Sequence, residues 1–258
     1  MRASYPDLKG RAAIVTGASS GIGLAIARAL LEQGTRVAVQ YRGSRAAAQA
    51  LCDEYPARAV AIQADLGTES GCVKLATEAR ERLSGVDVLV HSAGISNSAP
   101  IEAMRAETLE EMFRVNVFSA FYLVRELAPA LRAAGRASIV LIGSTAGQRG
   151  EERHSHYAAS KGALQSLGMS LAVELAPAVR TNVVSPGWIR TPMAEPTLRT
   201  VGPVIASTLP NKRLGEAEDV VDAVLYLASD ASSHVLGENI SVSGGALLVV
   251  PRGQLQPR

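Results

Sequence analysis

Short apolar runs alternate with longer helical patterns along this chain, and this alternation restricts the fold more than any other feature. The first run, Ala-Ala-Ile-Val-Thr at 12–16, has no polar alternation, as expected of a parallel strand buried on both faces. The predicted strands are 12–16, 35–41, 59–63, 86–91, 137–142, 179–185 and 239–242. The predicted helices are 22–34, 44–55, 68–83, 107–131, 157–175 and 216–228. We therefore predict an α/β fold: a single Rossmann-type doubly wound parallel sheet of about seven strands, with helices on both faces.

One domain over residues 1–258 is the simplest organisation for this chain. The sequence contains no repeat, no low-complexity stretch and no linker rich in Pro, Gly or Ser. The segment 193–214 has weak periodicity and three prolines, which is typical of a mobile flap over a site. The polar segment 251–258 is predicted to be a loose tail.

Composition excludes several function classes. The net charge of +2 is too small to indicate nucleic acid or an anionic membrane as a partner. Residues 1–9 carry charge and a proline without an apolar segment, so we expect no secretory signal, and no run reaches membrane-spanning length. Cys52 and Cys72 lack CxxC or Cys/His neighbours, which predicts free thiols in a cytoplasmic protein and no metal site.

A glycine-rich turn follows the first predicted strand and precedes the first helix. It has the sequence Gly17-Ala18-Ser19-Ser20-Gly21-Ile22-Gly23. Backbone N–H groups and a helix N-terminus in this setting bind a diphosphate, and glycine allows the close approach. The spacing is G-x-x-x-G-x-G and differs from the common G-x-G-x-x-G fingerprint. A turn that only connects strand to helix is therefore the alternative.

Tyr157 and Lys161 are four residues apart at the start of a predicted helix, so they project from the same face. An ammonium beside a phenol lowers the tyrosine pKa from its usual value of about 10, which suits general acid–base catalysis near neutral pH. The alternative is an ordinary helix-surface pair. Tyr5 and Lys9 have the same spacing, but Pro6 lies between them and no helical pattern follows.

Ser144 follows the predicted strand 137–142, whose carboxyl end should lie on the same side of the sheet as the glycine turn. It is either a turn residue or a catalytic hydroxyl. His154 and His156 precede Tyr157 closely, but the charged segment 149–153 beside them predicts a solvated loop. We therefore do not assign them a catalytic role.

Taken together, these features resemble the short-chain dehydrogenase/reductase family over nearly the whole chain, in particular its 3-oxoacyl-acyl-carrier-protein-reductase-like members. The resemblance implies a catalytic tetrad of Asn116, Ser144, Tyr157 and Lys161. The glycine turn would contribute cofactor contacts from Gly17, Ser19, Ser20, Gly21, Ile22 and Gly23. Further cofactor contacts would come from Tyr41, Arg42, Asp65, Leu66, Ala93, Gly94, Tyr157, Lys161, Pro186, Gly187, Ile189 and Thr191.

The activity implied by this resemblance is hydride transfer between NADP(H) or NAD(H) and a small-molecule carbonyl or alcohol. Tyr157 would be the general acid–base, and Ser144 would hydrogen-bond the substrate oxygen. Lys161 would lower the tyrosine pKa and hold the nicotinamide ribose, and Asn116 would carry a proton relay through water to Lys161. The alternative is a catalytically silent NAD(P)-binding regulatory protein of the same fold. Retention of all the catalytic side chains favours the enzyme.

One departure from the family pattern affects the centre of the sheet. The family usually has Asn-Asn-Ala-Gly after the fourth strand, where this chain has His91-Ser92-Ala93-Gly94. Because those asparagines help to hold the central strands together, the change predicts a locally weaker sheet.

The residues after the second strand indicate which cofactor is preferred. An NAD-selective enzyme usually has a carboxylate there, but the first acid in this chain is Asp53, inside the next helix. Arg42 and Arg45 stand nearby, and a guanidinium can bind a 2′-phosphate with two hydrogen bonds, to which Ser44 could add a third. We predict that NADP(H) is preferred over NAD(H). Ser20 favours the alternative of a pocket that accepts both, because NADP-selective relatives often carry a basic residue there.

Two helical patterns, 107–131 and 157–175, are apolar nearly all round, which indicates burial on more than one face. A second subunit would provide that burial, so we expect a homo-oligomer, either a tetramer or a dimer. The loop 95–104 and the flap are expected to line the substrate pocket, although neither has a charge pattern that identifies the substrate.

Overall fold

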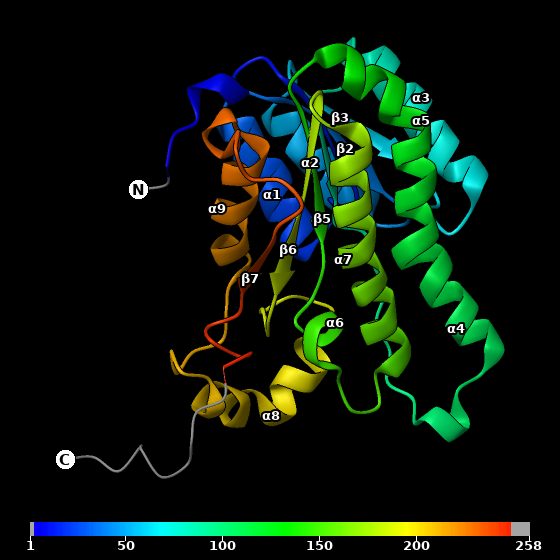
Figure 1. Ribbon diagram of the computed structural model, residues 1–258, viewed down its shortest axis with the longest axis vertical. Coiled ribbons are helices and arrows are strands. Elements are labelled where there is room, and N and C mark those ends of the chain that lie inside the picture. Colours follow the sequence, from blue (N-terminus) through cyan, green and yellow to red (C-terminus); the bar gives the residue numbers. More distant parts are fainter. Residues whose placement is uncertain (1–2, 249–258) are drawn as a thin grey trace.

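A computed structural model describes residues 3–248, and the tail predicted at 251–258 lies outside this range. Seven parallel strands form one sheet in the order β3-β2-β1-β4-β5-β6-β7 (Figure 1). The doubly wound fold predicted from the sequence is confirmed. The strands are β1 (Ala12–Val15), β2 (Arg36–Tyr41), β3 (Ala59–Gln63), β4 (Val88–His91), β5 (Ala137–Ile142), β6 (Val179–Pro186) and β7 (Asn239–Val242).

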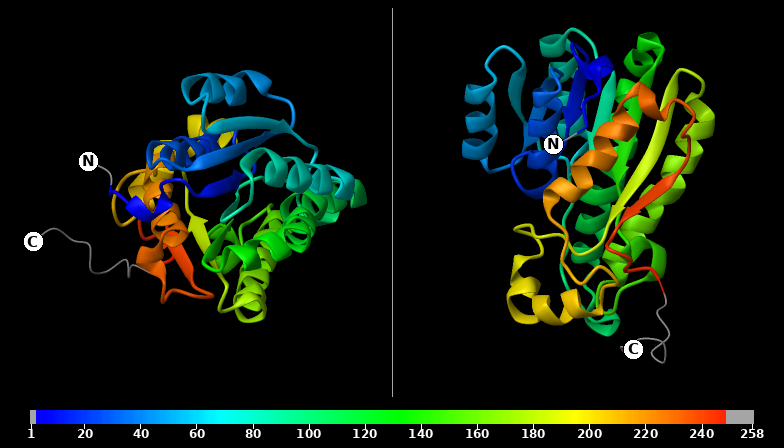
Figure 2. Two further views of the ribbon diagram at one scale, coloured as in Figure 1. Left: turned by 90° about the horizontal axis from the view of Figure 1, so that it is seen from above. Right: turned by 90° about the vertical axis from the view of Figure 1, so that its left-hand side faces the viewer.

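Helices cover both faces of the sheet (Figure 2). They are α1 (Gly21–Glu32), α2 (Arg45–Glu54), α3 (Glu69–Leu83), α4 (Ala106–Phe113), α5 (Ser119–Ala134), α6 (Ala146–Arg149), α7 (Ser155–Leu175), α8 (Glu195–Thr208) and α9 (Ala217–Ala228). Short 3₁₀ turns occupy Pro6–Leu8, Ile101–Ala103 and Asp230–Ser232. Leu75, Leu123 and Leu164 from α3, α5 and α7 belong to the core on one face. Ile26, Leu51 and Val224 from α1, α2 and α9 belong to the core on the other.

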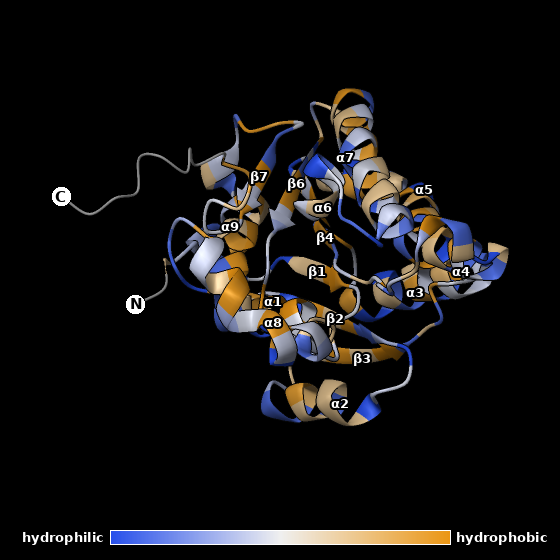
Figure 3. Cartoon of the chain, turned by 90° about the horizontal axis from the view of Figure 1, so that it is seen from below, coloured by the Kyte–Doolittle hydropathy of each residue, from blue (hydrophilic) through white to orange (hydrophobic). Residues whose placement is uncertain are grey.

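The central strands are buried on both faces, which explains why their sequences show no polar alternation. Every residue of β1, β4 and β5 is buried, and Figure 3 shows β1 mainly in orange, the hydrophobic end of the scale. Within residues 3–248, no helix is both long enough and apolar enough to cross a bilayer.

The single helix predicted at 107–131 is wrong in one respect. A π-helical turn, Arg114–Phe118, separates α4 from α5. Its wider turn contains Asn116, a fully buried residue whose amide hydrogen-bonds the backbone of Ile95 in the loop after β4. Apolar spacing alone cannot show such a turn, which occurs frequently at functional sites.

The segment predicted as a flap, 193–214, contains the helix α8. Pro196 lies in its first turn, where a missing N–H costs no helical hydrogen bond, and Pro203 is accommodated inside the helix. Leu198 and Gly202 are its buried residues. The prolines therefore did not prevent a helix here, and the mobility of this segment stays a prediction.

Helix N-termini agree with the sequence in one case and differ in another. The Thr68 hydroxyl accepts the N–H of Gly71 at 3.1 Å and so caps α3. Ser44, the first residue of the helix predicted at 44–55, stands at the N-cap of α2 without a side-chain capping bond. Its hydroxyl is therefore not used by the helix that it precedes.

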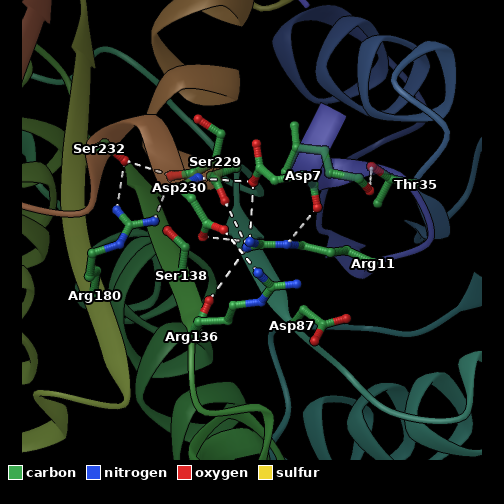
Figure 4. A network of polar contacts seen from close by, with 12 residues as sticks. Asp7, Arg11, Thr35, Asp87, Arg136, Ser138, Arg180, Ser229, Asp230 and Ser232 are labelled. Atoms are coloured by element: carbon green, nitrogen blue, oxygen red, sulfur yellow. Dashed lines mark hydrogen bonds and ion pairs between the residues drawn. The ribbon is translucent and has the colours of Figure 1, made fainter. Parts of the chain in front are cut away.

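A polar network joins the start of the chain to the end of α9 (Figure 4). Buried Arg11 contacts Asp230 at 2.5 Å and Asp7 at 3.1 Å, and Arg136 reaches the other oxygen of Asp230 at 3.1 Å. Arg180 donates to the carbonyls of Leu227 and Ser229 at 3.0 and 2.9 Å. Cations near the carboxyl end of a helix complement its dipole, so the network stabilises the end of α9.

Candidate active site

A cavity of about 670 Å³ opens at the carboxyl ends of the strands, on the side of the molecule where α6 and α8 lie (Figure 3). Eighteen of the site residues predicted from the sequence line this cavity. They are Gly17, Ser19, Ser20, Gly21, Ile22, Gly23, Arg42, Asp65, Leu66, Ala93, Gly94, Ser144, Tyr157, Lys161, Pro186, Gly187, Ile189 and Thr191. Two assigned residues, Tyr41 and Asn116, do not line the cavity. Tyr41 is buried in the core on the face of α1, and Asn116 is buried in the π turn.

The glycine turn is packed too closely for side chains at several positions. A Cβ on Gly17 would lie 2.9 Å from the Cα of Ala93, and one on Gly23 would lie 2.4 Å from the Gly17 carbonyl oxygen. Gly21 has a φ of +50°, and its missing Cβ would point at the Thr191 side chain. The turn therefore lies directly against the loops that follow β4 and β6. The first N–H groups of α1 have no partner within the helix, so they are free to bind an anion here.

Polar contacts fix the loops after β1, β2 and β4 to one another. Gln40 accepts the N–H of Gly17 on its side-chain oxygen at 2.7 Å. The Thr16 hydroxyl oxygen accepts the N–H groups of Ser92 and Ala93 at 3.0 and 2.9 Å. These contacts hold three strand ends in one arrangement, and all of their residues except Thr16 also line the cavity.

His91, which stands where the family usually has an asparagine, forms a hydrogen bond with α5. His91 is fully buried, and its Nε2 lies 2.8 Å from the hydroxyl of Ser119, which in turn donates to the Val115 carbonyl. Burial and the nearby Lys161 lower the pKa of His91 to about 3, so the ring is neutral at physiological pH. His91 therefore ties β4 to α5 by a specific contact where the sequence had predicted a weaker sheet.

Tyr157 and Lys161 share one face of α7, as their spacing predicted. The Lys161 ammonium lies 5.9 Å from the centre of the Tyr157 ring and donates to the Ile142 carbonyl at 2.9 Å. Burial lowers the pKa of Lys161 to about 8. It is therefore a desolvated cation close to the phenol.

The predicted lowering of the Tyr157 pKa is wrong for this structure. Burial raises the pKa of Tyr157 above its usual value, and the carboxylate of Glu151 acts in the same direction. A hydrogen bond with the Ser144 side chain opposes the rise only in part. The lysine charge favours the phenolate, but the cost of removing a phenolate from water is larger and dominates here.

Ser144 reaches Tyr157 because α6 packs closely against α7. Ser144 follows β5, and its hydroxyl oxygen accepts the N–H of Ala146 at the start of α6. A Cβ on Gly147 would lie 2.6 Å from the backbone nitrogen of Gly162 in α7. The absence of a side chain at Gly147 thus lets the two backbones meet and brings the serine beside the tyrosine.

Asn116 lies behind the cavity wall near Lys161. A Cβ on Gly94 would lie 3.3 Å from the Asn116 Oδ1 and 3.4 Å from the Lys161 Nζ, so both groups flank this glycine. The Asn116 amide nitrogen also donates to the hydroxyl of Ser160 at 3.0 Å. Its amide is therefore fixed by neighbours, with the lysine ammonium close by.

Several residues that line the cavity were not predicted from the sequence: Gln40, Glu151, His154 and Trp188. The solvated loop predicted at 149–153 is confirmed, since most of these residues are exposed. His156 lies beyond this loop, is 3% exposed and hydrogen-bonds the side chain of Asn97. Helix α7 begins at Ser155, so His156 lies in its first turn and faces inward. The position of Gln40 at a strand end is a signal that could have identified it, but nothing in the sequence marks Glu151.

Arg42 and Ser44 line the cavity beyond the carboxyl end of β2. Arg42 is exposed, and it forms no ion pair with any carboxylate in the described part of the chain. Arg45 does not line the cavity. An unpaired guanidinium at this position is available to an anionic ligand.

Both cysteines are buried free thiols, as predicted, and burial raises the pKa of Cys72 to about 12. In residues 3–248, no three His, Cys, Asp or Glu side chains gather in a way that could hold a metal ion.

The sheet order and the glycine turn at its carboxyl edge define a dinucleotide-binding α/β protein. Residues 17–246 match the family model described as enoyl-(acyl carrier protein) reductase. The chain is 36% identical to versicolorin reductase stcU of Emericella nidulans, over 93% of this chain and 96% of that protein. It is 32% identical to 3-oxoacyl-[acyl-carrier-protein] reductase FabG of Escherichia coli, over 94% of this chain and all of that protein. A solved structure titled as a short-chain dehydrogenase/reductase of the glucose/ribitol dehydrogenase type, from Brucella melitensis, superposes with a TM-score of 0.91 at 34% identity, over 96% of this chain and all of that one.

These matches span almost the whole chain at identities above 30%. The chain belongs to the short-chain dehydrogenase/reductase family and is an NAD(P)-dependent enzyme.

Proposed function

We propose that this enzyme transfers a hydride between NADP(H) and a small carbonyl or alcohol substrate, with Tyr157 as the general acid–base. The observation that carries the proposal is the grouping of three side chains: Ser144 partly offsets the rise that burial causes in the pKa of the Tyr157 phenol, and the buried Lys161 ammonium lies 5.9 Å from the centre of the Tyr157 ring. The same cavity is lined by the glycine turn, so a dinucleotide and a carbonyl can occupy it together.

In the proposed reaction, the nicotinamide supplies or accepts the hydride. Tyr157 donates its proton to the carbonyl oxygen as the alcohol forms, and Ser144 donates a hydrogen bond to the same oxygen. The raised pKa of Tyr157 keeps that proton in place until the substrate is bound. The Lys161 ammonium then stabilises the phenolate left behind. We assign Asn116, which flanks Gly94 together with Lys161, to the relay that returns a proton through water.

The cofactor residues fit the two halves of a dinucleotide. The N–H groups at the start of α1 face the cavity and suit the diphosphate. Asp65 and Leu66 are assigned to the adenine, and the loop after β6 with Pro186 and Thr191 to the nicotinamide side. Unpaired Arg42, with Ser44 beside it, supports NADP(H) over NAD(H) because its guanidinium suits a 2′-phosphate.

The outer surfaces of α5 and α7 support a homo-oligomer, either a tetramer or a dimer. Phe121 on α5 is 52% exposed, and Val173 and Met169 on α7 are 83% and 55% exposed. Phe118, at the end of the π turn just before α5, is 43% exposed. Apolar groups at this density on two neighbouring helices are more typical of an interface than of a free surface. Sedimentation as a monomer at micromolar concentration would contradict the assembly.

We expect the protein to be cytoplasmic. We also expect residues 1–258 to form one domain.

The test of the catalytic assignment is Tyr157→Phe, which keeps the ring and removes the proton donor. We expect turnover to fall by about 10²-fold or more, with the Kd of NADPH changed by less than about twofold. Tyr122→Phe on α5 is the matched control, since that tyrosine contacts Arg125 away from the cavity. Near-normal turnover of the Tyr157 variant would rule out its role as the acid.

A further inference from the structure

The loop after β4 is held by hydrogen bonds at every second residue, Ile95, Asn97 and Ala99. Its partners lie in the π turn, in α7 and in the loop before α7. The backbone of Ile95 exchanges two hydrogen bonds with the Asn116 amide, at 2.8 and 3.0 Å. Asn97 pairs with His156, and the N–H of Ala99 donates to the Arg153 carbonyl at 2.8 Å. A loop held at three points is a rigid wall, and Ser96, Asn97 and Ser98 of this wall line the cavity.

The His156 ring determines the orientation of the Asn97 amide. Burial lowers the pKa of His156, so the ring is neutral and carries one N–H. Its Nε2 faces the Asn97 Oδ1, whereas its Nδ1 is buried without a partner in the described residues. A buried N–H without an acceptor is costly, which places the proton on Nε2, where it is donated to Asn97. The amide nitrogen of Asn97 is thereby left as a donor.

The Asn97 side chain stands between the buried His156 ring and the cavity. Asn97 is exposed and lines the cavity, whereas His156, on the other side of the amide, is buried. No partner for the Asn97 amide nitrogen is found among residues 3–248. A fixed donor on the wall of a cavity suits an acceptor oxygen of a ligand.

We propose that Asn97 is a specificity-determining residue that donates a hydrogen bond to a second oxygen of the substrate, and that His156 is the positioning residue that holds it. The substrate class is a carbonyl compound with an additional uncharged oxygen a few bonds from the reacting carbon, such as a 3-oxo ester or a hydroxyketone. This inference rests on the proposed carbonyl chemistry of the site and extends it to the choice of substrate.

The test uses two ketones with chains of equal length, ethyl 3-oxobutanoate and 2-heptanone, of which only the first carries further oxygens, in its ester group. The measured quantity is the ratio of their kcat/KM values, with whichever of NADPH and NADH supports faster turnover. We expect the wild type to favour the oxo ester, and Asn97→Ala to lower the ratio about 3- to 10-fold, the effect of one neutral hydrogen bond. Because Asn97 is exposed, this variant should fold.

His156 is tested by a pair of substitutions. His156→Phe keeps the ring but removes the N–H and should lower the ratio to a similar extent. His156→Gln places an amide N–H near the position of Nε2 and should restore much of it, which a merely structural role would not do. His234→Phe, at an exposed histidine outside the cavity, is the control.

An unchanged ratio in Asn97→Ala, with both ketones still reduced, would overturn this inference and leave the proposed function intact. A His156→Gln ratio as low as that of His156→Phe would overturn the positioning role. Failure of the wild type to reduce any carbonyl with either cofactor would overturn the proposed function and this inference together.

Discussion

Replacement of Gly147 by alanine should push helices α6 and α7 apart. The new Cβ would lie 2.6 Å from the Gly162 nitrogen and 2.7 Å from the Lys161 carbonyl carbon, whereas ordinary contact begins at 3.4 Å. Both are backbone atoms of α7 and cannot rotate away. Helices α6 and α7 must therefore move apart by roughly 0.8 Å, which closely packed interiors transmit to their neighbours.

The movement should lower activity more than stability. Ser144 is three residues before Gly147, and its hydrogen bond with Tyr157 spans the gap that opens. A misplacement of about 1 Å can cost about 10²-fold in rate, so we expect kcat to fall roughly 10- to 100-fold. Overpacking costs about 1–3 kcal/mol in the free energy of unfolding, and the better helix propensity of alanine offsets about 1 kcal/mol of it.

The matched control is Gly162→Ala, on the other side of the same contact. Its Cβ would meet only the Gly147 carbonyl oxygen, at 3.3 Å, which a shift of a few tenths of an ångström relieves. Steady-state kcat and urea unfolding of both variants would be compared. If Gly147→Ala kept kcat within about twofold of the wild type, or lost no more than Gly162→Ala, the close packing of α6 on α7 would not be what positions Ser144.

Three further predictions concern the cofactor, the pH dependence and the polar network around Arg11. Arg42→Ala should lower the NADPH-to-NADH ratio of kcat/KM by about tenfold or more, the effect of losing charge-assisted hydrogen bonds; an unmoved ratio would refute the 2′-phosphate assignment. Burial lowers the pKa of Lys161 from 10.5 to about 8, so its ammonium is present below that pH and lost above it. The kcat for carbonyl reduction should therefore fall as the pH rises through about 8. A rate that stayed flat to pH 9.5 would contradict this. Arg11→Met should reduce the free energy of unfolding in urea by about 1–3 kcal/mol, since it removes the buried partner of Asp7 and Asp230; an unchanged midpoint would show that the network contributes nothing.

The fold could be predicted because its strands are buried on both faces. A run such as β5, with six buried residues in succession, differs in sequence from any amphipathic element. The glycine turn and Ser144 could be placed on one side of the sheet because parallel strands share one carboxyl edge. That argument needs only topology, which the alternation of elements supplies.

Other features depend on forces that spacing does not record. The π turn at Asn116 forms where a buried amide hydrogen-bonds the backbone of Ile95, a contact between distant segments. The pKa of Tyr157 is governed by burial, which a four-residue interval cannot measure. His156 has charged neighbours in sequence, yet the first turn of α7 faces it inward, toward Asn97. In each case the deciding contact comes from a loop or helix elsewhere in the chain.

The network around Arg11 also has a consequence for the order of events during synthesis. Arg11 stands just before β1, in the middle of the sheet, but its partner Asp230 is 219 residues further along the chain. A ribosome releases about 5–20 residues each second, so an emerging β1 must wait on the order of ten seconds or more for Asp230. Until then, Arg11 has only Asp7 as a counter-charge, and the amino end of the central strand lacks its contacts with the end of α9. Native assembly of this domain is therefore expected to finish only after translation has passed α9.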